Sequence, residues 1–235
     1  MSRVVQCVTC EKCCFGKMCK DYLFDNSLNL FNQSLQRNKA MRKGEYLYRC
    51  GDSITYLMAL RSGTVKIYDI NGNIVSVKIP GQLIGTEDLD YSAYHHCAIA
   101  ATDIQICLLE RSRIYDLSQI TENFINYTIE LLSFEIFEQQ KMISVLVSPD
   151  TQTKVREFLK LIAQRYVRYG FSPGNIPLPV TFKEMSTLLG VSLSSLNRAL
   201  AELKESDEII VEKKMMQIKN QNRDYDSRHA LLPEE

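Results

Sequence analysis

The chain has 235 residues, of which 45% are apolar, 24% charged and 9% aromatic, so it can bury a hydrophobic core and is not typical of a disordered protein. Its 28 basic and 28 acidic residues balance, which argues against a protein that coats nucleic acid over its whole surface. No apolar run approaches the roughly 18 residues that cross a bilayer, and the segment before Glu11 lacks the apolar stretch of a secretory signal. We therefore expect a cytoplasmic protein with no membrane partner.

Five of the eight cysteines fall in residues 1–20, and three of them, Cys10, Cys13 and Cys19, form a C-x2-C-x5-C pattern. Disulfides are rare in a reducing compartment, where clustered cysteines more often bind metal. Four thiolates are the usual ligands of an iron–sulfur cluster or a structural zinc ion, so we expect residues 1–20 to be a cysteine-rich cluster-binding segment. Spacing leaves the fourth ligand open, and its candidates are Cys7, Cys14, Cys50, Cys97 and Cys107.

Short apolar runs separated by turn residues dominate residues 44–109 and predict a small antiparallel barrel or roll. We expect this β-roll sensor domain to comprise residues 21–113. The predicted strands are residues 45–48, 56–60, 64–70, 74–79, 97–101 and 104–109. Asn71-Gly72 predicts a two-residue type I′ hairpin turn, because both residue types tolerate a positive φ. Cys50 and Cys97 are suited to the interior as small apolar side chains.

Residues 114–148 contain no proline or glycine and predict one long helix. Apolar residues recur there in alternating steps of four and three, which is typical of a coiled-coil seam with one polar position. The seam consists of Ile125, Ile129, Leu132, Ile136, Gln139, Ile143 and Leu146. A second stripe consists of Ile120, Phe124, Tyr127, Leu131 and Phe134, and it is suited to packing on the chain's own β-domain. Two stripes indicate two partners, so we expect a homodimer; a single helix packed on its own domain is the simpler alternative.

A domain boundary is predicted at Ser148-Pro149, where Ser148 can cap and Pro149 can begin a new helix. Residues 149–219 then predict a compact helical module. Its first helix is amphipathic, with apolar residues at Val155, Phe158, Leu159 and Ile162. The turn-rich residues 170–179 follow this helix. The polar tail, residues 220–235, predicts no element.

Thr181 and Glu184 have the spacing of a capping box, Gly190 suits the end of the helix that they begin, and Ser192 can cap the next helix. Four leucines of that next helix, Leu193, Leu196, Leu200 and Leu203, are predicted to be buried, while Ser194, Ser195, Asn197 and Arg198 form a polar face. This pattern is that of a helix-turn-helix, whose second helix enters the major groove. Arginine pairs with guanine, asparagine with adenine, and serine with bases or phosphate. A plain helical bundle is the alternative.

Lys213-Lys214 lies between two apolar runs, residues 209–211 and 215–218, and reads as the tip of a β-hairpin wing. Such a pair is suited to a phosphate contact, although a solvated turn is the simpler alternative.

Several motifs resemble those of a known family over residues 7–219. They are Cys10-x2-Cys13-x5-Cys19, Lys43-Gly44-Glu45, Gly51-Asp52, Leu60-Arg61-Ser62-Gly63-Thr64-Val65-Lys66, Tyr169-Gly170-Phe171-Ser172-Pro173, Leu189-Gly190-Val191-Ser192 and Asn197-Arg198. With these motifs the chain resembles the cyclic-AMP receptor protein and fumarate–nitrate reduction regulator (CRP/FNR) family, and within it the FNR-type oxygen sensors. The resemblance implies an α+β protein with an N-terminal double-stranded β-helix (jelly-roll-like) sensor domain, a long dimerisation helix and a C-terminal winged helix-turn-helix domain.

The resemblance also implies a [4Fe-4S] cluster held by Cys10, Cys13, Cys19 and Cys107, while Cys7, Cys14, Cys50 and Cys97 have no counterpart in the family. In the absence of oxygen, such a protein is a homodimer that binds a palindromic promoter site and recruits RNA polymerase as an activator. Oxygen converts the cluster, and the dimer dissociates.

Three departures from the family qualify these expectations. The base-reading Glu and Ser of the family fall at Ser194 and Asn197, so the target sequence is expected to differ in part. At the position of Gln139 the family has an acidic residue, whose two copies repel each other across the two-fold axis of the dimer. Because Gln139 removes this repulsion, the metal-free dimer should be more stable and DNA binding less dependent on oxygen. Residues 81–94 lack the Arg-Ser pair that binds the phosphate of a cyclic nucleotide, so none is expected as effector.

Two alternatives keep the fold and the DNA binding. In one, a thiol switch such as Cys13-Cys14 or a zinc site replaces the cluster; in the other, the dimer is constitutive and independent of a cluster. An enzyme is not expected, because the chain has no nucleotide-binding fingerprint and no HExxH zinc motif. His95-His96 is more suited to a loop than to a metal site.

Overall fold

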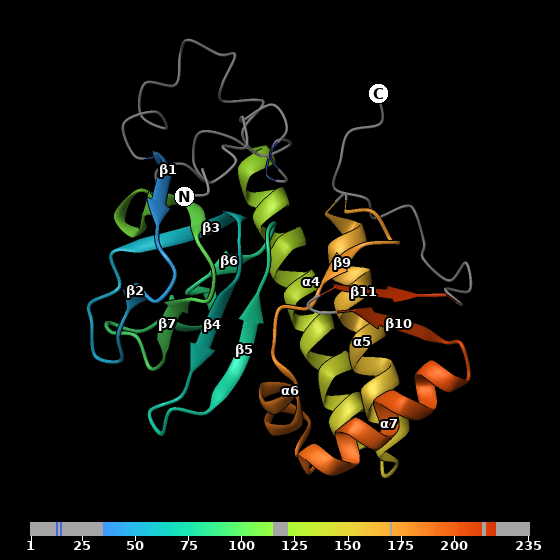
Figure 1. Ribbon diagram of the computed structural model, residues 1–235. Coiled ribbons are helices and arrows are strands. Elements are labelled where there is room, and N and C mark those ends of the chain that lie inside the picture. Colours follow the sequence, from blue (N-terminus) through green and yellow to red (C-terminus); the bar gives the residue numbers. More distant parts are fainter. Residues whose placement is uncertain are drawn as a thin grey trace. The chain divides into compact units, whose positions relative to one another are not determined.

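The computed structural model describes residues 13, 15, 35–114, 122–169, 171–212 and 215–219, and the statements below concern these residues (Figure 1). They form two compact units, one up to Ser133 and one from Phe134. The division therefore falls inside the long helix α4 (Glu122–Val147). The boundary predicted after Ser148 falls in the short break between two helices, and it stays a prediction as a domain boundary.

The first unit consists of two four-stranded antiparallel sheets. One has the order β1 (Leu35–Met41), β8 (Ile104–Glu110), β3 (Tyr56–Ser62) and β6 (Leu83–Ile84). The other has the order β2 (Tyr46–Tyr48), β7 (Cys97–Ala100), β4 (Val65–Tyr68) and β5 (Ile74–Lys78). A short 3-10 helix, η2 (Thr86–Asp88), follows β6. This arrangement is the expected β-roll, so the predicted α+β fold with a jelly-roll-like domain is confirmed.

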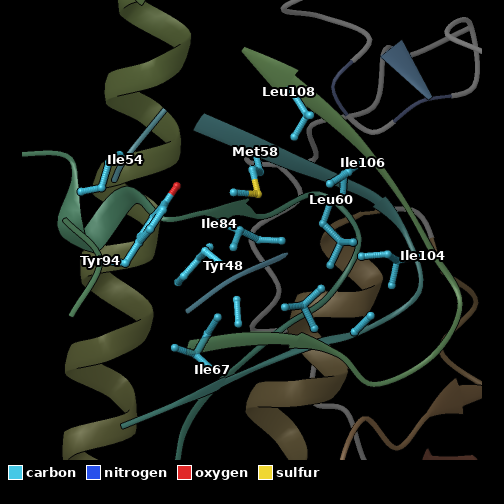
Figure 2. Packing of buried hydrophobic residues seen from close by; sticks show 13 residues of the cluster. Tyr48, Ile54, Met58, Leu60, Ile67, Ile84, Tyr94, Ile104, Ile106 and Leu108 are labelled. Carbon is cyan, nitrogen blue, oxygen red and sulfur yellow. The ribbon is translucent and has the colours of Figure 1, made fainter. Parts of the chain in front are cut away.

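Side chains from both sheets point into one core, which Figure 2 shows from close by. Its buried members are Tyr48, Ile54, Met58, Leu60, Val65, Ile67, Ile84, Tyr94, Ala98, Ala100, Ile104, Ile106 and Leu108. Alternate residues of the predicted strands supply most of this list, because successive side chains of a strand point to opposite faces. The two sheets of the roll therefore share one hydrophobic core.

The sequence missed two strands of the roll. β1 has the sequence LQRNKAM, which lacks the alternation of a half-buried strand, and Gln36, Lys39 and Ala40 are indeed exposed. β6 is only two residues long and follows the turn at Gly81. Both are placed by pairing with neighbouring strands, β1 with β8 and β6 with β3, which no local pattern records.

The predicted type I′ turn at Asn71-Gly72 is wrong. Gly72 has a φ of 80°, but among the described residues the one non-glycine residue with a positive φ is Asp207. Instead, the Asp69 carboxylate accepts the amide protons of Asn71 and Asn73, at 2.9 and 2.7 Å. The side chain of an aspartate thus organises a wider loop between β4 and β5, as aspartate commonly does in turns.

The second unit continues α4 with α5 (Thr151–Arg168), α6 (Phe182–Leu189) and α7 (Leu193–Glu205). A three-stranded antiparallel sheet has the order β10 (Ile209–Glu212), β11 (Met215–Ile218) and β9 (Ile176–Pro177). The sequence missed β9, because its two residues lie in a proline-rich connector. The core of the module is built from α5, α6 and α7 and contains Val155, Phe158, Leu159, Ile162, Met185, Leu189, Leu196, Leu200 and Leu203.

The predicted cap of the first module helix is wrong. α5 begins at Thr151, and its N-cap is Asp150, whose carboxylate accepts the Thr153 amide proton at 2.7 Å. Hydrogen bonds from Thr153 hold the pKa of Asp150 below its ordinary value. Aspartate is as good an N-cap as serine, so Ser148 and Pro149 are left to the turn after α4. Within the described residues, no helix is long and apolar enough to span a membrane.

We predict that Gly63→Ala destabilises the roll far more than Gly72→Ala. Both glycines have a positive φ, which costs an L-residue about 1–2 kcal/mol. A Cβ on Gly63 would lie 2.3 Å from the Asp103 carbonyl oxygen, whereas a Cβ on Gly72 would meet nothing within 4 Å. Urea unfolding should show a loss of about 3 kcal/mol or more for Gly63→Ala and about 1–2 kcal/mol for Gly72→Ala. Equal losses would contradict the close approach at Gly63.

Candidate nucleic-acid interface and cysteine sites

Two capped helices and the turn between them form the predicted helix-turn-helix. The capping box of α6 is confirmed: the Thr181 hydroxyl oxygen accepts the Glu184 amide proton at 3.3 Å, and the Glu184 carboxylate accepts the Thr181 amide proton at 2.7 Å. Gly190 ends the helix with a φ of 62°, as predicted. Ser192 caps α7 by accepting the Ser195 amide proton at 3.0 Å. Local sequence chemistry therefore sets the angle at which α7 leaves the turn.

Helix α7 (Figure 1) has one buried and one exposed face. Leu196, Leu200 and Leu203 are buried, as predicted, together with Ala199. The prediction for Leu193 is wrong, because its side chain is 44% exposed. Leu193 is the first residue of the helix, where the helical period alone does not guarantee a neighbour to pack against. An exposed leucine at this place is a candidate for apolar contact with a thymine methyl group.

The structure brings the predicted polar residues of α7 together on the exposed side. Ser194, Asn197 and Arg198 are exposed, with Asn197 and Arg198 three and four positions after Ser194, while Ser195 is half-buried. The Arg198 side chain is 76% exposed, and its nearest acidic group, Glu202, lies 4.0 Å away on the same helix. Such a pair contributes little, so the guanidinium is available to another partner.

The hairpin after α7 is tied to α5 by a bidentate ion pair. Arg156 donates to both carboxylate oxygens of Glu208, with Nε–Oε2 and Nη2–Oε1 distances of 2.6 and 3.2 Å. Glu208 lies just before β10, so this pair positions the wing strands β10 and β11 against the module. Lys213 and Lys214, the predicted tip of the wing, lie outside the described residues.

The predicted dimer seam lies along α4, and most of its side chains are exposed. Ile129, Ile136 and Ile143 are 59%, 57% and 59% exposed, and Leu146 is 39% exposed. Gln139 is also exposed, Leu132 is half-buried, and the Ile125 side chain is outside the described set. Exposed isoleucines at a heptad spacing form an apolar stripe that the described part of the chain leaves open.

A different face of α4 packs within the chain. Leu131 is buried, and the Arg168 guanidinium of α5 lies 3.4 Å from the centroid of the Phe134 ring. Glu138 is buried beside Arg165 of α5, with a distance of 2.9 Å between Oε1 and Nε. Burial raises the pKa of Glu138, and the charge of Arg165 opposes that rise. The other predicted members of this stripe, Ile120, Phe124 and Tyr127, have no described side chains.

Two of the four predicted cluster ligands lie in the described part of the chain. Cys13 is buried, with 8% of its side chain exposed, and Cys107 is half-buried on β8, where it pairs with Ala59 of β3. Cys10 and Cys19, like Cys7 and Cys14, lie outside the described residues. Among the residues that are described, no three His, Cys, Asp or Glu side chains gather as a metal site.

The interpretation of Cys50 as a buried apolar residue is wrong, because the structure exposes it; Cys97 is half-buried. The amide of Cys50 donates to the sulfur of Cys97 at 3.3 Å. The sequence held no signal for this pairing, because the two residues are 47 positions apart.

The segment after β6 places the buried ring of Tyr94 inside the roll. Tyr94 stacks on Tyr48, with 3.7 Å between the ring centroids, and both are buried. Burial raises the pKa of Tyr94 to about 12. His95 has a structural contact in this loop: its Nδ1 lies 2.9 Å from Oδ1 of the buried Asp88 in η2.

Comparison with known proteins agrees with this architecture. Residues 38–120 match the family model of the cyclic nucleotide-binding domain. The fumarate and nitrate reduction regulatory proteins of Salmonella typhi and of Escherichia coli (strain K12) are each 26% identical to this chain over 218 residues, which is 91% of this chain and 87% of theirs.

Solved structures share the fold. FixK2 from Bradyrhizobium japonicum has a TM-score of 0.66 and 20% identity, and the match covers 78% of this chain and 92% of FixK2. A CRP-family transcriptional regulator from Thermus thermophilus has a TM-score of 0.58 and 18% identity, covering 77% of this chain and 91% of that one.

A β-roll followed by a long helix and a winged helix-turn-helix module defines a class: this protein is a DNA-binding transcriptional regulator, and its relatives are regulators rather than enzymes. The expected resemblance is confirmed: the chain is similar to regulators of the CRP/FNR family.

We predict that Glu208→Gln destabilises the module at neutral pH but not at acidic pH. Hydrogen bonding to Arg156 lowers the pKa of Glu208 from its ordinary value of 4.5. The folded protein therefore holds this carboxylate's proton less tightly than the unfolded chain does. The pair stabilises the fold above about pH 4.5, and this stabilisation is lost as the pH falls through the folded pKa.

Thermal unfolding at neutral pH should show a loss of about 0.5–1 kcal/mol for Glu208→Gln, because the pair is partly screened by solvent. The difference from the native protein should vanish in acid. Glu212→Gln, which changes an exposed carboxylate on β10, is the control. A loss that is the same at every pH would contradict a role for the charge.

Proposed function

We propose that this protein is a homodimeric regulator whose binding to a palindromic promoter site is controlled by a [4Fe-4S] cluster that responds to oxygen. The observation that carries the proposal is the exposed polar face of α7, held outward by buried leucines directly after a capped turn. This is the geometry that a helix needs to enter the major groove with its N-terminal end first.

In this proposal, five residues of α7 contact DNA. Arg198 donates two hydrogen bonds to a guanine, and Asn197 pairs with an adenine edge. Ser194 and Ser195 bind base edges or phosphate. Leu193, which is exposed beside them, contacts a thymine methyl group.

The second copy of the chain covers the exposed stripe of α4. Ile129, Ile136 and Ile143 recur every seven residues, so two parallel copies would bury them against each other about a two-fold axis. Gln139 lies in the same seam and places no charge at the axis. A two-fold dimer presents two α7 helices, which is why a palindromic site is expected.

The cluster ligands of the proposal are Cys10, Cys13, Cys19 and Cys107. Four soft thiolate sulfurs fit a [4Fe-4S] cluster, and the two described donors, one buried and one half-buried, are partly withdrawn from water. The cluster would be held between the N-terminal cysteines and Cys107 on β8, and it would supply an oxygen-labile group there. As in the family, the active dimer recruits RNA polymerase as an activator under anaerobic conditions.

No cyclic nucleotide is part of this proposal. The two sheets of the roll share one hydrophobic core, and two stacked tyrosines face the interior of the roll beside η2. The main alternative keeps the DNA binding and replaces the cluster by a thiol switch or a zinc site. A visible absorption spectrum distinguishes the cluster from the thiol switch and the zinc site, because zinc and thiols do not absorb visible light.

Arg198→Ala should weaken binding to a selected site by about 5- to 150-fold, the value of one bidentate contact to guanine. The site is first selected from a randomised palindromic library, and affinity is measured by fluorescence anisotropy at fixed salt. The variant should also lose its preference at one base pair of each half-site. Lys204→Ala, an exposed change at the far end of α7, is the control and should keep that preference. Unchanged specificity in Arg198→Ala would contradict the proposed reading of the base.

Anaerobic reconstitution should give a coloured protein with about four irons per chain, whose colour changes in air. Cys107→Ser should lose most of the iron, sulfide and visible absorbance, because one of four ligands is missing. Cys50→Ser removes another thiol of the roll and should keep all three. A colourless native protein would move the assignment to the thiol or zinc alternative and leave DNA binding intact.

Gln139→Asp should dissociate the metal-free dimer, because two carboxylates would face each other across the seam. Gln140→Asp places the same charge one residue away from the seam and is the matched control. Sedimentation of the metal-free protein at micromolar concentration should show dimers for the native chain and Gln140→Asp, and monomers for Gln139→Asp. A native chain that is monomeric under these conditions contradicts the role given to Gln139.

A further inference from the structure

Two cysteines outside the proposed cluster come together at the end of β2. Tyr48, the last residue of β2, pairs with Ala98 of β7, and the two strands lie side by side (Figure 1). The pairing continues past Cys50, since the Gly51 amide donates to the Tyr94 carbonyl at 2.8 Å. Between these contacts, the Cys50 amide donates to Sγ of Cys97 at 3.3 Å. One thiol therefore lies directly against the backbone of the other cysteine.

This placement suits a disulfide. Neighbouring strands are about 4.7–4.9 Å apart, and disulfides usually join Cα atoms that are about 4.4–6.8 Å apart. Sγ of Cys97 lies 3.3 Å from the Cys50 backbone nitrogen, so the two cysteines are close neighbours. Both residues are thiols in this structure.

The two thiols differ in access, which gives them different roles. Cys50 is exposed, whereas Cys97 is half-buried and receives the amide hydrogen bond. Thiols that sense oxidants are typically accessible and lie next to a second, resolving cysteine. Cys50 would therefore meet the oxidant, and Cys97 would resolve the product.

We propose that Cys50 and Cys97 are a redox-active pair that forms an intramolecular disulfide on reaction with a peroxide, independently of the cluster. The Cys50 sulfur attacks hydrogen peroxide: an S–O bond forms, the O–O bond breaks, and the leaving hydroxide takes the thiol proton to become water. The Cys97 sulfur then attacks the sulfenic sulfur of Cys50. The S–S bond forms, the S–O bond breaks, and a second water leaves with the remaining proton, so two thiols and one peroxide give one disulfide and two waters.

The disulfide would link two segments of the roll covalently. It joins the segment after β2 to the start of β7, next to the Tyr48–Tyr94 stack and to His95, which binds Asp88 of η2. The disulfide would hold the segment between η2 and β7 to the β2 edge, and thiol reductants would release it. The regulator would then have a second redox input besides the proposed cluster.

The test is mass spectrometry of the full-length protein after treatment with stoichiometric hydrogen peroxide and alkylation of the remaining thiols. Cleavage on the amino side of aspartate places Cys50, Cys97 and Cys107 on separate peptides, residues 25–51, 90–102 and 103–115. We expect peptides 25–51 and 90–102 to be joined, two hydrogens lighter than their sum, and to separate on reduction. The joined pair should be absent from Cys50→Ser and Cys97→Ser and present in Cys107→Ser.

The experiment is run on both reconstituted and metal-free protein, so that failure of the cluster assignment does not affect it. The thermal midpoint of the oxidised native protein should rise by several degrees, and that of oxidised Cys50→Ser should not. Full alkylation of Cys50 and Cys97 after peroxide would overturn the proposal. So would a bond from Cys97 to Cys107, or a covalent dimer through Cys50.

Discussion

The buried ion pair between Glu138 and Arg165 is the electrostatic constraint that joins α4 to α5 in the second unit. A carboxylate inside a protein is strongly destabilised unless a cation is placed against it, and here burial raises the pKa of Glu138 while Arg165 opposes the rise. The pair, with Arg168 on the Phe134 ring, therefore fixes which face of α4 is turned to α5. Because one face of α4 is used in this way, Ile136 and Ile143 are left outward. Helix α7 belongs to the same compact unit as this part of α4.

In the DNA-binding module, local hydrogen bonds begin the helices, and apolar contacts between residues far apart in the sequence pack them together. Side-chain caps from Thr181, Ser192 and Asp150 begin its helices and satisfy amides that a helix leaves unpaired. Leucines of α7 then anchor that helix, and the Arg156–Glu208 pair positions the hairpin behind it. The result is a rigid platform with polar side chains on its open side. Rigidity matters because contacts to base edges require side chains held at a fixed register.

The roll uses its cysteines in two ways in our proposals. Cys107 lies on β8, in the sheet with β3, whereas Cys50 and Cys97 lie along the edge formed by β2 and β7 in the other sheet. The two sets are thus on different sheets of one domain and share a core of aliphatic and tyrosine side chains (Figure 2). A core packed in this way transmits a local change, because close-packed side chains do not deform independently.

Short-range rules decided much of this protein from its sequence. Six of the eight described strands of the roll, the long helix, the capping box and the glycine turn before α7 all follow from periodicity and from residues with special backbone chemistry, which act within a few positions. Tertiary structure decided what those rules do not contain. β1 and β6 exist because neighbouring strands pair with them. Leu193 is exposed although it shares the helical period of the buried leucines. Asp69 organises the turn between β4 and β5 by its own hydrogen bonds in place of the expected type I′ geometry. The meeting of Cys50 with Cys97, and of Glu138 with Arg165, depends on strand register and helix packing, which arise only when the whole chain is folded.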